Sequence, residues 1–560
     1  MPSVHARRPL RSAVLTAALA SSVVLPGAVA AADEPAGTAV VGRLVQAVAE
    51  AAPDEHEDHA EEGALAWVQP ADGNAVPVDA DSVADIPSGA TVELTVGGEV
   101  ADDVSDDAAL EVLEKEVVEL PAVAPALAHP SGLTNRVTVV LVQPGGVAAD
   151  GVTEEQIVDA VNGPVAEFWA EQSNGAVTLG AVDSHGWTPT VTDCRGTAGD
   201  LWAEVARKVG FVAGPGNHLL LYLSSAAKGC AFALAQVGTA TTSGGSLYVQ
   251  TTTPSAIAHE LGHNFGLGHS SGKQCDAAVE GGSCRTVGYR DYYDVMGVSW
   301  ARIGSLNAPQ AARIKLLPET QVQTLGVRSA VTTATLAPLS GRSGIRALRL
   351  TDAAGVDYWL EYRTATGRDA WLGTRHDVRA LDTGVLLRRA GTALPDTSVL
   401  LDATPTAAAG WGTDFQAALP VGVAVPVSGG DFSVVVQSVS AAGAVVSVTP
   451  VPPTGEAPAA GRAATPEVPA GTVMPGAAAP PAVAPAAAGT VMPGVAAAPA
   501  VAPPVVAVAE SEPRPVRTVT ALDTTSHTFG GERLLVAAAG ALLVGATLLV
   551  IRRLRALRAR

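Results

Sequence analysis

The middle of the chain alternates short apolar runs with amphipathic stretches. Residues 136–142, 218–223 and 246–250 are short apolar runs, which predict buried strands. Residues 153–174 begin with a threonine and two glutamates and continue with spaced apolar side chains, a pattern typical of a helix and its start. We therefore predict an α/β domain over residues 131–320, with helices packed on a mixed sheet.

Residues 321–450 show a different pattern. Short apolar segments at 358–363, 384–389 and 432–436 are separated by turn residues, which predicts an all-β sandwich. Four carboxylates of this region could bind calcium, but no calcium-loop spacing links them. We interpret them as surface or turn carboxylates: Glu361, Asp382, Asp402 and Asp414.

The N-terminal region, residues 31–130, is acidic. Between residues 33 and 120 the chain carries 23 acidic residues, and Arg43 and Lys115 are its basic ones, so the region differs sharply in charge from the domains that follow. Segments 64–68 and 90–96 predict strands of a small β unit, and 106–120 predicts a helix.

Both ends of the chain predict export. Residues 1–30 combine arginines, an apolar run and an Ala-Val-Ala end, which indicates a signal peptide. Residues 451–533 are rich in proline and alanine, which predicts a disordered linker. Residues 534–551 carry no charge and are followed by a basic tail, 552–560, which predicts a single transmembrane helix with a cytoplasmic tail. We expect the protein on the extracellular face of the cell membrane.

Charge and cysteine content narrow the possible functions. The formal net charge of −20 argues against nucleic-acid binding, because little positive charge is available to neutralise phosphates. Four cysteines in an exported chain suggest two disulfides, with three possible connectivities. Cys275 and Cys284 bracket a short loop, which favours that pair and leaves Cys194 with Cys230.

Candidate chemistry lies in the sequence His-Glu-Leu-Gly-His-Asn-Phe-Gly-Leu-Gly-His, which starts at His259. His259 and His263 are four residues apart, so a helix places both on one face, where they can bind one ion. Glu260 can act on a metal-bound water as a general base. Gly266 allows the chain to turn back as a hinge, so that His269 becomes a third ligand. Three ligands leave a zinc position open for water, as in catalytic sites.

The eleven-residue motif resembles the zinc-binding sequence of the metzincin metallopeptidases. Residues 292–297 contain a methionine and look most like the gametolysin-type branch. The resemblance implies a metzincin-like catalytic domain with a central zinc-binding helix, and it implies that Met296 supports the imidazoles without binding zinc. Val298 stands where some metzincins place a tyrosine ligand, so a tyrosine at that place is not expected. By resemblance, residues 31–130 are a possible propeptide, although they lack the cysteine that matrix-type propeptides use to block zinc.

Together these features predict a membrane-anchored zinc endopeptidase that cleaves extracellular or cell-wall-associated proteins or peptides. The alternative is a surface adhesion protein that displays a metallopeptidase-like scaffold. Two further histidines of the catalytic domain, His185 and His218, are interpreted as hydrogen-bonded structural residues.

Overall fold

The computed structural model describes the acidic N-terminal region, the predicted catalytic domain and the predicted β-sandwich. The described residues are 37–51, 63–100, 109–121, 132–299, 302–392, 394–406 and 412–452. Within these ranges no helix is both long and apolar enough to cross a membrane. The signal peptide, the transmembrane helix, the basic tail and nearly all of the linker that the sequence predicts lie outside the described residues.

A ten-stranded mixed sheet runs through the N-terminal region and the predicted catalytic domain. Its catalytic part contains the strands expected from the apolar runs, with β6, β7, β8 and β10 parallel and β9 antiparallel to β10. Strand β1 pairs antiparallel with β9 and joins the N-terminal strands to this sheet. In sheet order the strands are β2 (Ala64–Gln69), β3 (Val76–Val78), β5 (Ala109–Glu119), β4 (Thr91–Val100), β1 (Thr38–Glu50), β9 (Ala233–Gln236), β10 (Gly245–Val249), β8 (Asn217–Leu223), β6 (Asn135–Gln143) and β7 (Leu179–Pro189).

One predicted element of the N-terminal region has a different structure. The helix expected at residues 106–120 is strand β5, paired antiparallel with β4. The physical reason is a period of two near its start, where Leu110 and Val112 pack against the apolar core of the N-terminal strands while the glutamates between and beyond them stay outside. The many glutamates favour helix locally, but the sheet pairing outweighs this weak propensity.

The helices pack against the catalytic part of the sheet, except the last one, which packs against strands of the sandwich. They are α1 (Glu154–Ala160), α2 (Ala166–Gln172), α3 (Ala198–Val209), α4 (Pro254–Asn264) and α5 (Ala308–Arg313). The long helix expected at 153–174 begins with a capping box at Thr153, as the sequence indicates, but a π-helical turn over Val161–Val165 separates α1 from α2. This turn contains Gly163 and Pro164, and proline removes a backbone donor inside a helix.

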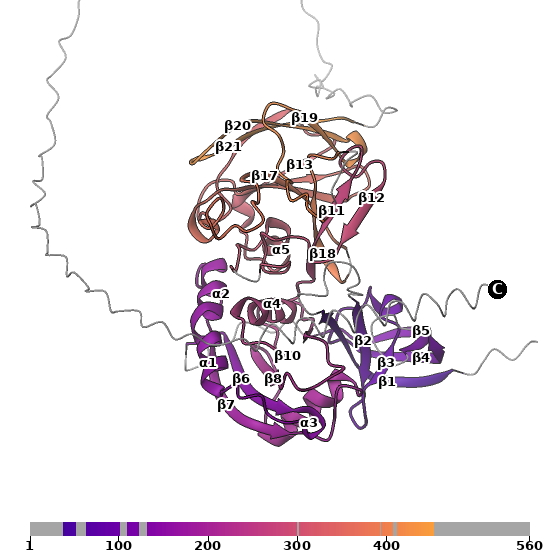
Figure 1. The fold of residues 1–560 in the computed structure, drawn as a ribbon. Helices are drawn as coiled ribbons and strands as arrows, with labels where there is room; N and C mark the ends of the chain where they lie inside the picture. The colour runs from indigo at the N-terminus through magenta and orange to yellow at the C-terminus, as the bar shows by residue number, and fades with distance from the viewer. Residues whose placement is uncertain are drawn as a thin grey trace, which may run out of the picture. The chain divides into compact units, whose positions relative to one another are not determined.

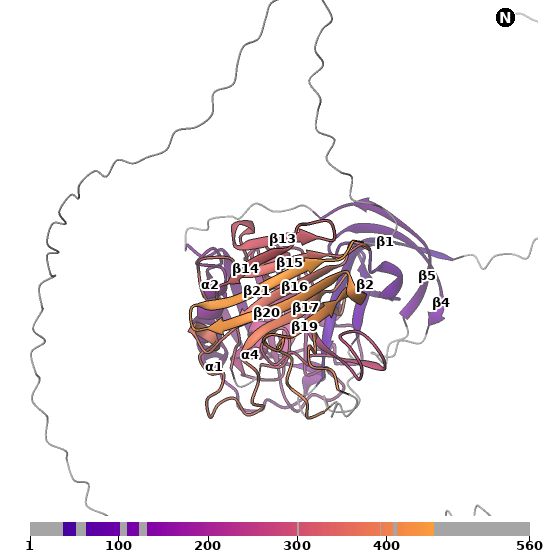
Figure 2. The same ribbon diagram turned by 90° about the horizontal axis from the view of Figure 1, so that it is seen from above.

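The β-sandwich consists of two sheets that face each other, as Figures 1 and 2 show. Their apolar faces form a common core that includes Leu360, Leu387, Phe432 and Val446. The larger sheet has the order β12 (Cys284–Val287), β11 (His269–Cys275), β18 (Asp396–Leu401), β17 (Gly384–Ala390), β16 (Asp357–Arg363), β15 (Ala347–Thr351), β13 (Val322–Gly326). The smaller has the order β14 (Thr332–Leu336), β21 (Gly443–Pro450), β20 (Phe432–Ser440), β19 (Ala424–Val427).

The boundary between the catalytic domain and the sandwich differs from the one at residue 320 that the sequence suggests. Strands β11 and β12 precede that position, yet they belong to the seven-stranded sheet of the sandwich. β11 pairs in parallel with β18, more than a hundred residues later in the chain. Such a distant pairing leaves no local sequence signal. The sandwich therefore begins at His269, inside the metal-binding motif.

Candidate metal centre

Helix α4 carries the first two histidines of the motif. Pro254 opens the helix at a position where its missing amide hydrogen costs nothing, and Thr253 precedes it in an extended conformation. All helix residues from Ser255 to Asn264 are buried, and α4 lies between the ten-stranded sheet and α5 in Figure 1. Ile257 packs in the core of the sheet on the side of the helix away from the metal motif. The helix is therefore a rigid support for the imidazoles.

Hydrogen bonds orient the imidazoles of His259 and His263. The Nδ1 atom of His259 donates to the carbonyl oxygen of Val295 at 2.7 Å, and the Nδ1 atom of His263 donates to the carbonyl oxygen of Leu267 at 2.8 Å. Because carbonyl oxygens only accept, these contacts place a proton on Nδ1, so that in the neutral ring the lone pair lies on Nε2. This is the usual outer-shell arrangement of metal-binding histidines.

A glycine turn brings the third histidine to the helix. Gly266 has a φ of +100°, and its amide donates to the carbonyl oxygen of His263 at 2.8 Å. A Cβ atom at this position would also approach backbone atoms of Thr239 at 3.2 Å. The left-handed conformation and the close backbone both favour glycine, as the sequence predicts for the hinge. His269 then starts strand β11.

The three imidazoles meet at a carboxylate that sequence reasoning missed. Oε1 of Glu50 lies 2.9 Å from Nε2 of His269, 3.1 Å from Nε2 of His263 and 3.3 Å from Nε2 of His259. The four ligand atoms lie within 4.8 Å of one another, and all four residues are buried. Glu50 is the last residue of β1 in the acidic region, and 213 residues separate it from His263. Only the pairing of β1 with β9 reveals this proximity.

The donor set fits a divalent metal ion. Three imidazole nitrogens and one carboxylate oxygen form a set that zinc prefers. His259 Nε2 and Glu260 Oε2 are buried, and neither has a hydrogen-bond partner within the described part of the chain. A buried polar atom without a partner is costly unless another group satisfies it. A metal ion bound by the three histidines would satisfy His259 Nε2 and so remove the free-energy cost of burying it without a hydrogen-bond partner.

The surroundings of the centre shift the pKa values of the two carboxyls, Glu50 and Glu260, in opposite directions. Burial raises the pKa of Glu50, but the neighbouring His269 and His259 outweigh it and hold this pKa well below its usual range. Burial, together with the negative charge of Glu50, raises the pKa of Glu260 well above its usual range. Burial lowers the pKa of His269 to about 4 despite the nearby carboxylate of Glu50, whereas the same carboxylate outweighs burial at His259 and raises its pKa. A bound cation, or the departure of Glu50, therefore lowers the pKa of Glu260 towards the range of a proton acceptor.

Met296 lies in the apolar core beneath the histidine helix. A Cβ atom at Gly262 would collide with the Met296 sulfur, so the glycine of the motif allows this close packing. The turn that carries Met296 is fixed by Asp294, whose carboxylate accepts hydrogen bonds from the backbone amides of Met296 and Asn307. Met296 is fully buried. The position agrees with an apolar support.

Tyr289, which no sequence pattern marks as a site residue, also lies at the centre. The Tyr289 ring is 4.0 Å from that of His269, measured between centroids, and its hydroxyl donates to the carbonyl oxygen of Ala49 at 3.4 Å. Val298, where no tyrosine ligand is expected, contacts the same segment, because its amide donates to the carbonyl oxygen of Tyr289 at 3.1 Å. Tyr289 has no motif spacing that could have identified it.

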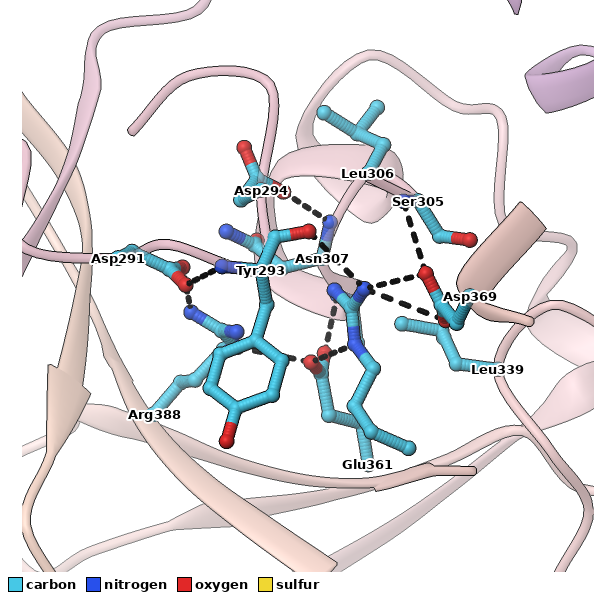
Figure 3. A network of polar contacts seen from close by, with 12 residues as sticks. Asp291, Tyr293, Asp294, Ser305, Leu306, Asn307, Leu339, Glu361, Asp369 and Arg388 are labelled. Carbon is cyan, nitrogen blue, oxygen red and sulfur yellow. Dashed lines mark hydrogen bonds and ion pairs between the residues drawn. The ribbon is translucent and has the colours of Figure 1, made fainter. Parts of the chain in front are cut away.

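A buried ionic network, drawn in Figure 3, supports the segments around the third histidine. The Ser270 hydroxyl donates to Asp291 at 2.7 Å, and Asp291 pairs with Arg388 of β17. The guanidinium groups of Arg388 and Arg363 each donate to Glu361 at 2.9 Å. Glu361 is fully buried, so its interpretation as a surface or turn carboxylate is wrong. The two arginines explain how a carboxylate can be buried in a strand.

The other three carboxylates considered for calcium accept hydrogen bonds from backbone amides. Asp382 accepts from the amide of Ala417 at 3.1 Å. Asp402 accepts from the amide of Thr404, and Asp414 from the amide of Gln416. The last two are contacts two residues along the chain, typical of turns.

The two histidines outside the motif lie away from the cluster. His218 is buried between Asn264, at 2.8 Å from its Nδ1, and Asn135, at 2.9 Å from its Nε2. Burial lowers its pKa to about 4. His185 is partly exposed beside Asp183 at 3.0 Å. Both make structural hydrogen bonds.

Two disulfides lie in the predicted catalytic domain. Cys194 is bonded to Cys230, and Cys275 is bonded to Cys284. The second bond joins the paired strands β11 and β12 beyond His269. These are the two pairs that the cysteine spacing favours.

Comparison with known proteins gives one relevant match. Residues 216–270, from β8 through the third histidine, match the model of a metallopeptidase family described as M12B reprolysin-like. No curated protein matches the chain. A solved structure described as a chaperone–substrate complex is similar at 14% identity over 36% of this chain and 29% of that chain, with a TM-score of 0.18, which is too low to carry an argument. The family match and the buried cluster of three histidines and a glutamate support a metallopeptidase with a divalent metal site, of the kind that zinc occupies.

Proposed function

We propose that the protein is a zinc-dependent endopeptidase of the metzincin type. The observation that carries this proposal is the convergence of three Nε2 atoms beside Glu260, a buried carboxyl whose Oε2 has no partner in the described structure. Metal ligands alone would serve a structural site as well. A buried carboxyl next to a ligand in sequence, with one oxygen free of hydrogen bonds to the described residues, is suited to proton transfer.

In the proposed reaction the three histidines bind the metal and Glu260 transfers the proton. Zinc, when bound, would polarise the scissile carbonyl and lower the pKa of a bound water. His259, His263 and His269 would hold the ion, and the carbonyl oxygens of Val295 and Leu267 keep two of the rings in the binding orientation. Glu260 takes the proton from the attacking water and delivers it to the amine that leaves, so that the peptide bond is hydrolysed to a carboxylate and an amine.

The finer assignments rest on sequence. The motif and the Met296 segment support the gametolysin-like branch of the metzincins. The signal peptide and the charge-free segment 534–551 support export and anchoring at the extracellular face of the membrane. The substrates would then be extracellular or cell-wall-associated proteins. A chain that ends at residue 452 should be released into the medium, whereas release of the intact full-length chain would contradict the anchor.

Cleavage of an unfolded protein such as casein tests the function. The full chain and its Glu50→Ala variant are assayed in parallel, because Glu50 lies at the metal position. We expect cleavage that 1,10-phenanthroline stops and added zinc restores in at least one of the two. If neither zinc-loaded protein cleaves casein or a mixture of peptides, the proposal is wrong and a surface adhesion role becomes the better reading.

A further inference from the structure

Strand β1 brings the N-terminal region to the metal centre. Residues Ala47 to Glu50 pair with β9 in antiparallel register, with Glu50 opposite Ala233. Further backbone hydrogen bonds extend the pairing at both ends. The Phe232 amide donates to the Glu50 carbonyl oxygen at 2.9 Å, and the Val237 amide donates to the Gln46 carbonyl oxygen at 2.7 Å. This is the addition of an extended segment to the edge of a sheet. β9 is thereby paired on both sides, with β10 and with β1.

The Glu50 side chain points at the histidines and at no basic residue. Its ion pairs in the described structure are all with His259, His263 and His269, and it is 4% exposed. A buried carboxylate is strongly unfavourable unless a cation or several donors compensate it. A lysine or arginine would do so in a structural ion pair. Here the Nε2 atoms of three imidazoles face the same Glu50 oxygen, and a metal ion bound by these imidazoles would supply the positive charge.

We propose that the N-terminal strands β1 to β5 are an inhibitor built into the chain, in which Glu50 is a removable fourth ligand of the metal. This inference rests on the proposed function, because it assigns a latent state to the same zinc site. Three histidines and one carboxylate make a closed four-coordinate site of the structural kind. With Glu50 in place, the position that a catalytic site keeps for water is filled.

The same strand excludes the substrate. The four residues of the cluster are at most 6% exposed, so the centre is closed to a polypeptide in this conformation. The backbone of residues 47–50 occupies the edge of β9 that β10 leaves open, and the last of these residues, Glu50, reaches the histidines. A peptide that reaches the metal must therefore displace the end of β1. Activation requires that the Glu50 carboxylate leave and that β1 separate from β9, with no covalent change at the centre.

A second contact holds the inhibitor in place. Trp67 of β2 lies 5.8 Å from Trp202 of α3, between ring centroids, and packs so closely on Gly199 that a Cβ atom there would meet it at 2.6 Å. The Ala75 amide donates to Asp200 of the same helix at 3.2 Å. The N-terminal region is therefore fixed at α3 as well as at the metal. Weakening the contact between Trp67 and Trp202 should therefore make it easier for Glu50 to leave the metal position, although Trp67 does not contact Glu50.

Access to the metal can be measured without turnover. Acetohydroxamate binds zinc at an open position, and calorimetry gives its affinity for the zinc-loaded full chain. All proteins carry Glu260→Gln, which removes the general base. We expect Glu50→Ala to bind the hydroxamate at least about tenfold more tightly than the parent. The reason is that, if at least about nine tenths of the parent is in the inhibited state, its apparent affinity is reduced at least about tenfold. Glu50→Gln keeps the shape of the side chain but is a poor metal ligand, so it should bind the hydroxamate about as tightly as Glu50→Ala. Trp67→Ala should also bind the hydroxamate more tightly than the parent.

Glu93→Gln is the matched control, because Glu93 is an exposed glutamate of the neighbouring strand β4. It should bind the hydroxamate as the parent does. Equal affinity in the parent and both Glu50 variants would overturn the proposal. Loss of zinc from both Glu50 variants would also overturn it, since Glu50 would then be a permanent ligand.

Casein cleavage in the background with Glu260 intact separates this inference from the function. Glu50→Ala should cleave at least about tenfold faster than the parent, by the same population argument. Tight hydroxamate binding by Glu50→Ala without any cleavage would leave the blocking role intact and refute the peptidase. Equal cleavage by parent and variant would leave the peptidase intact and refute the inhibitor.

Discussion

The backbone amide of His269 donates a hydrogen bond to the carbonyl oxygen of Pro395 at 2.6 Å. This bond ties the third histidine of the metal cluster to the segment that enters β18 of the sandwich. The Gly268 amide donates to the Thr397 hydroxyl at 2.8 Å, and the same hydroxyl donates to Gln310. The sandwich therefore takes part in building the metal centre and is more than a domain that follows it.

Gly268→Ala tests this dependence. A Cβ atom at position 268 would collide with the carbonyl oxygen of Pro395, so β11 must shift away from β18 and carry His269 with it. We expect a loss of about 1–3 kcal/mol in stability and a weaker zinc affinity. Gly98→Ala is the control, because nothing lies within 4 Å of the added atom. Competition with a chromogenic chelator measures the affinity, and equal values for both variants would contradict the role of the sandwich.

Glu260→Gln should separate metal binding from turnover. The glutamine keeps the size of the side chain but does not accept the proton of the water. In the Glu50→Ala background, zinc content should stay unchanged while casein cleavage falls by about a hundred- to ten-thousand-fold. Cleavage close to that of the Glu50→Ala protein would exclude Glu260 as the general base. Zinc analysis of the same sample shows whether the metal is retained.

Arg388→Met should destabilise the fold strongly. Arg388 is fully buried and pairs with both Asp291 and Glu361, so its removal leaves two carboxylates without this partner. Breaking a buried ion pair in this way costs about 3–5 kcal/mol. Arg195→Met is the comparison, because that arginine is exposed beside Asp193 and should change little. Urea denaturation of both variants measures the effect, and similar midpoints would show that the network contributes little.

His218 should make stability depend on pH. Its pKa falls from 6.5 to about 4 in the folded protein, so the unfolded chain binds more protons between these values. Stability contributed by the neutral ring is complete above about pH 6.5 and decreases as the pH falls towards about 4, by a total of about 3 kcal/mol. Denaturation of the parent and of His218→Gln across this window isolates the contribution of the ring. Parallel curves for the two proteins would contradict it.

The local features of the site could be predicted from sequence because they depend on neighbours in the chain. The spacing of His259 and His263 follows from the helix period, and the φ of +100° at Gly266 follows from the need for the chain to turn back. The buried strands at β6, β8 and β10 are equally local, since each is a short apolar run.

Features that depend on distant pairing could not be predicted. Glu50 belongs to a strand whose partner β9 lies nearly two hundred residues away, and no motif marks it as a ligand. The membership of β11 in the sandwich has the same origin. Glu361 reads as one of many strand or turn carboxylates until Arg363 and Arg388 are placed around it.

The most direct test of the account is zinc-dependent cleavage by the full-length Glu50→Ala protein, compared with the same protein carrying His263→Ala. We predict that the first cleaves casein, that phenanthroline abolishes the cleavage and that stoichiometric zinc restores it, whereas the His263→Ala protein stays inactive in stoichiometric zinc. Cleavage that survives complete removal of zinc, or that is unchanged by the loss of His263, would contradict a zinc peptidase centred on the three histidines.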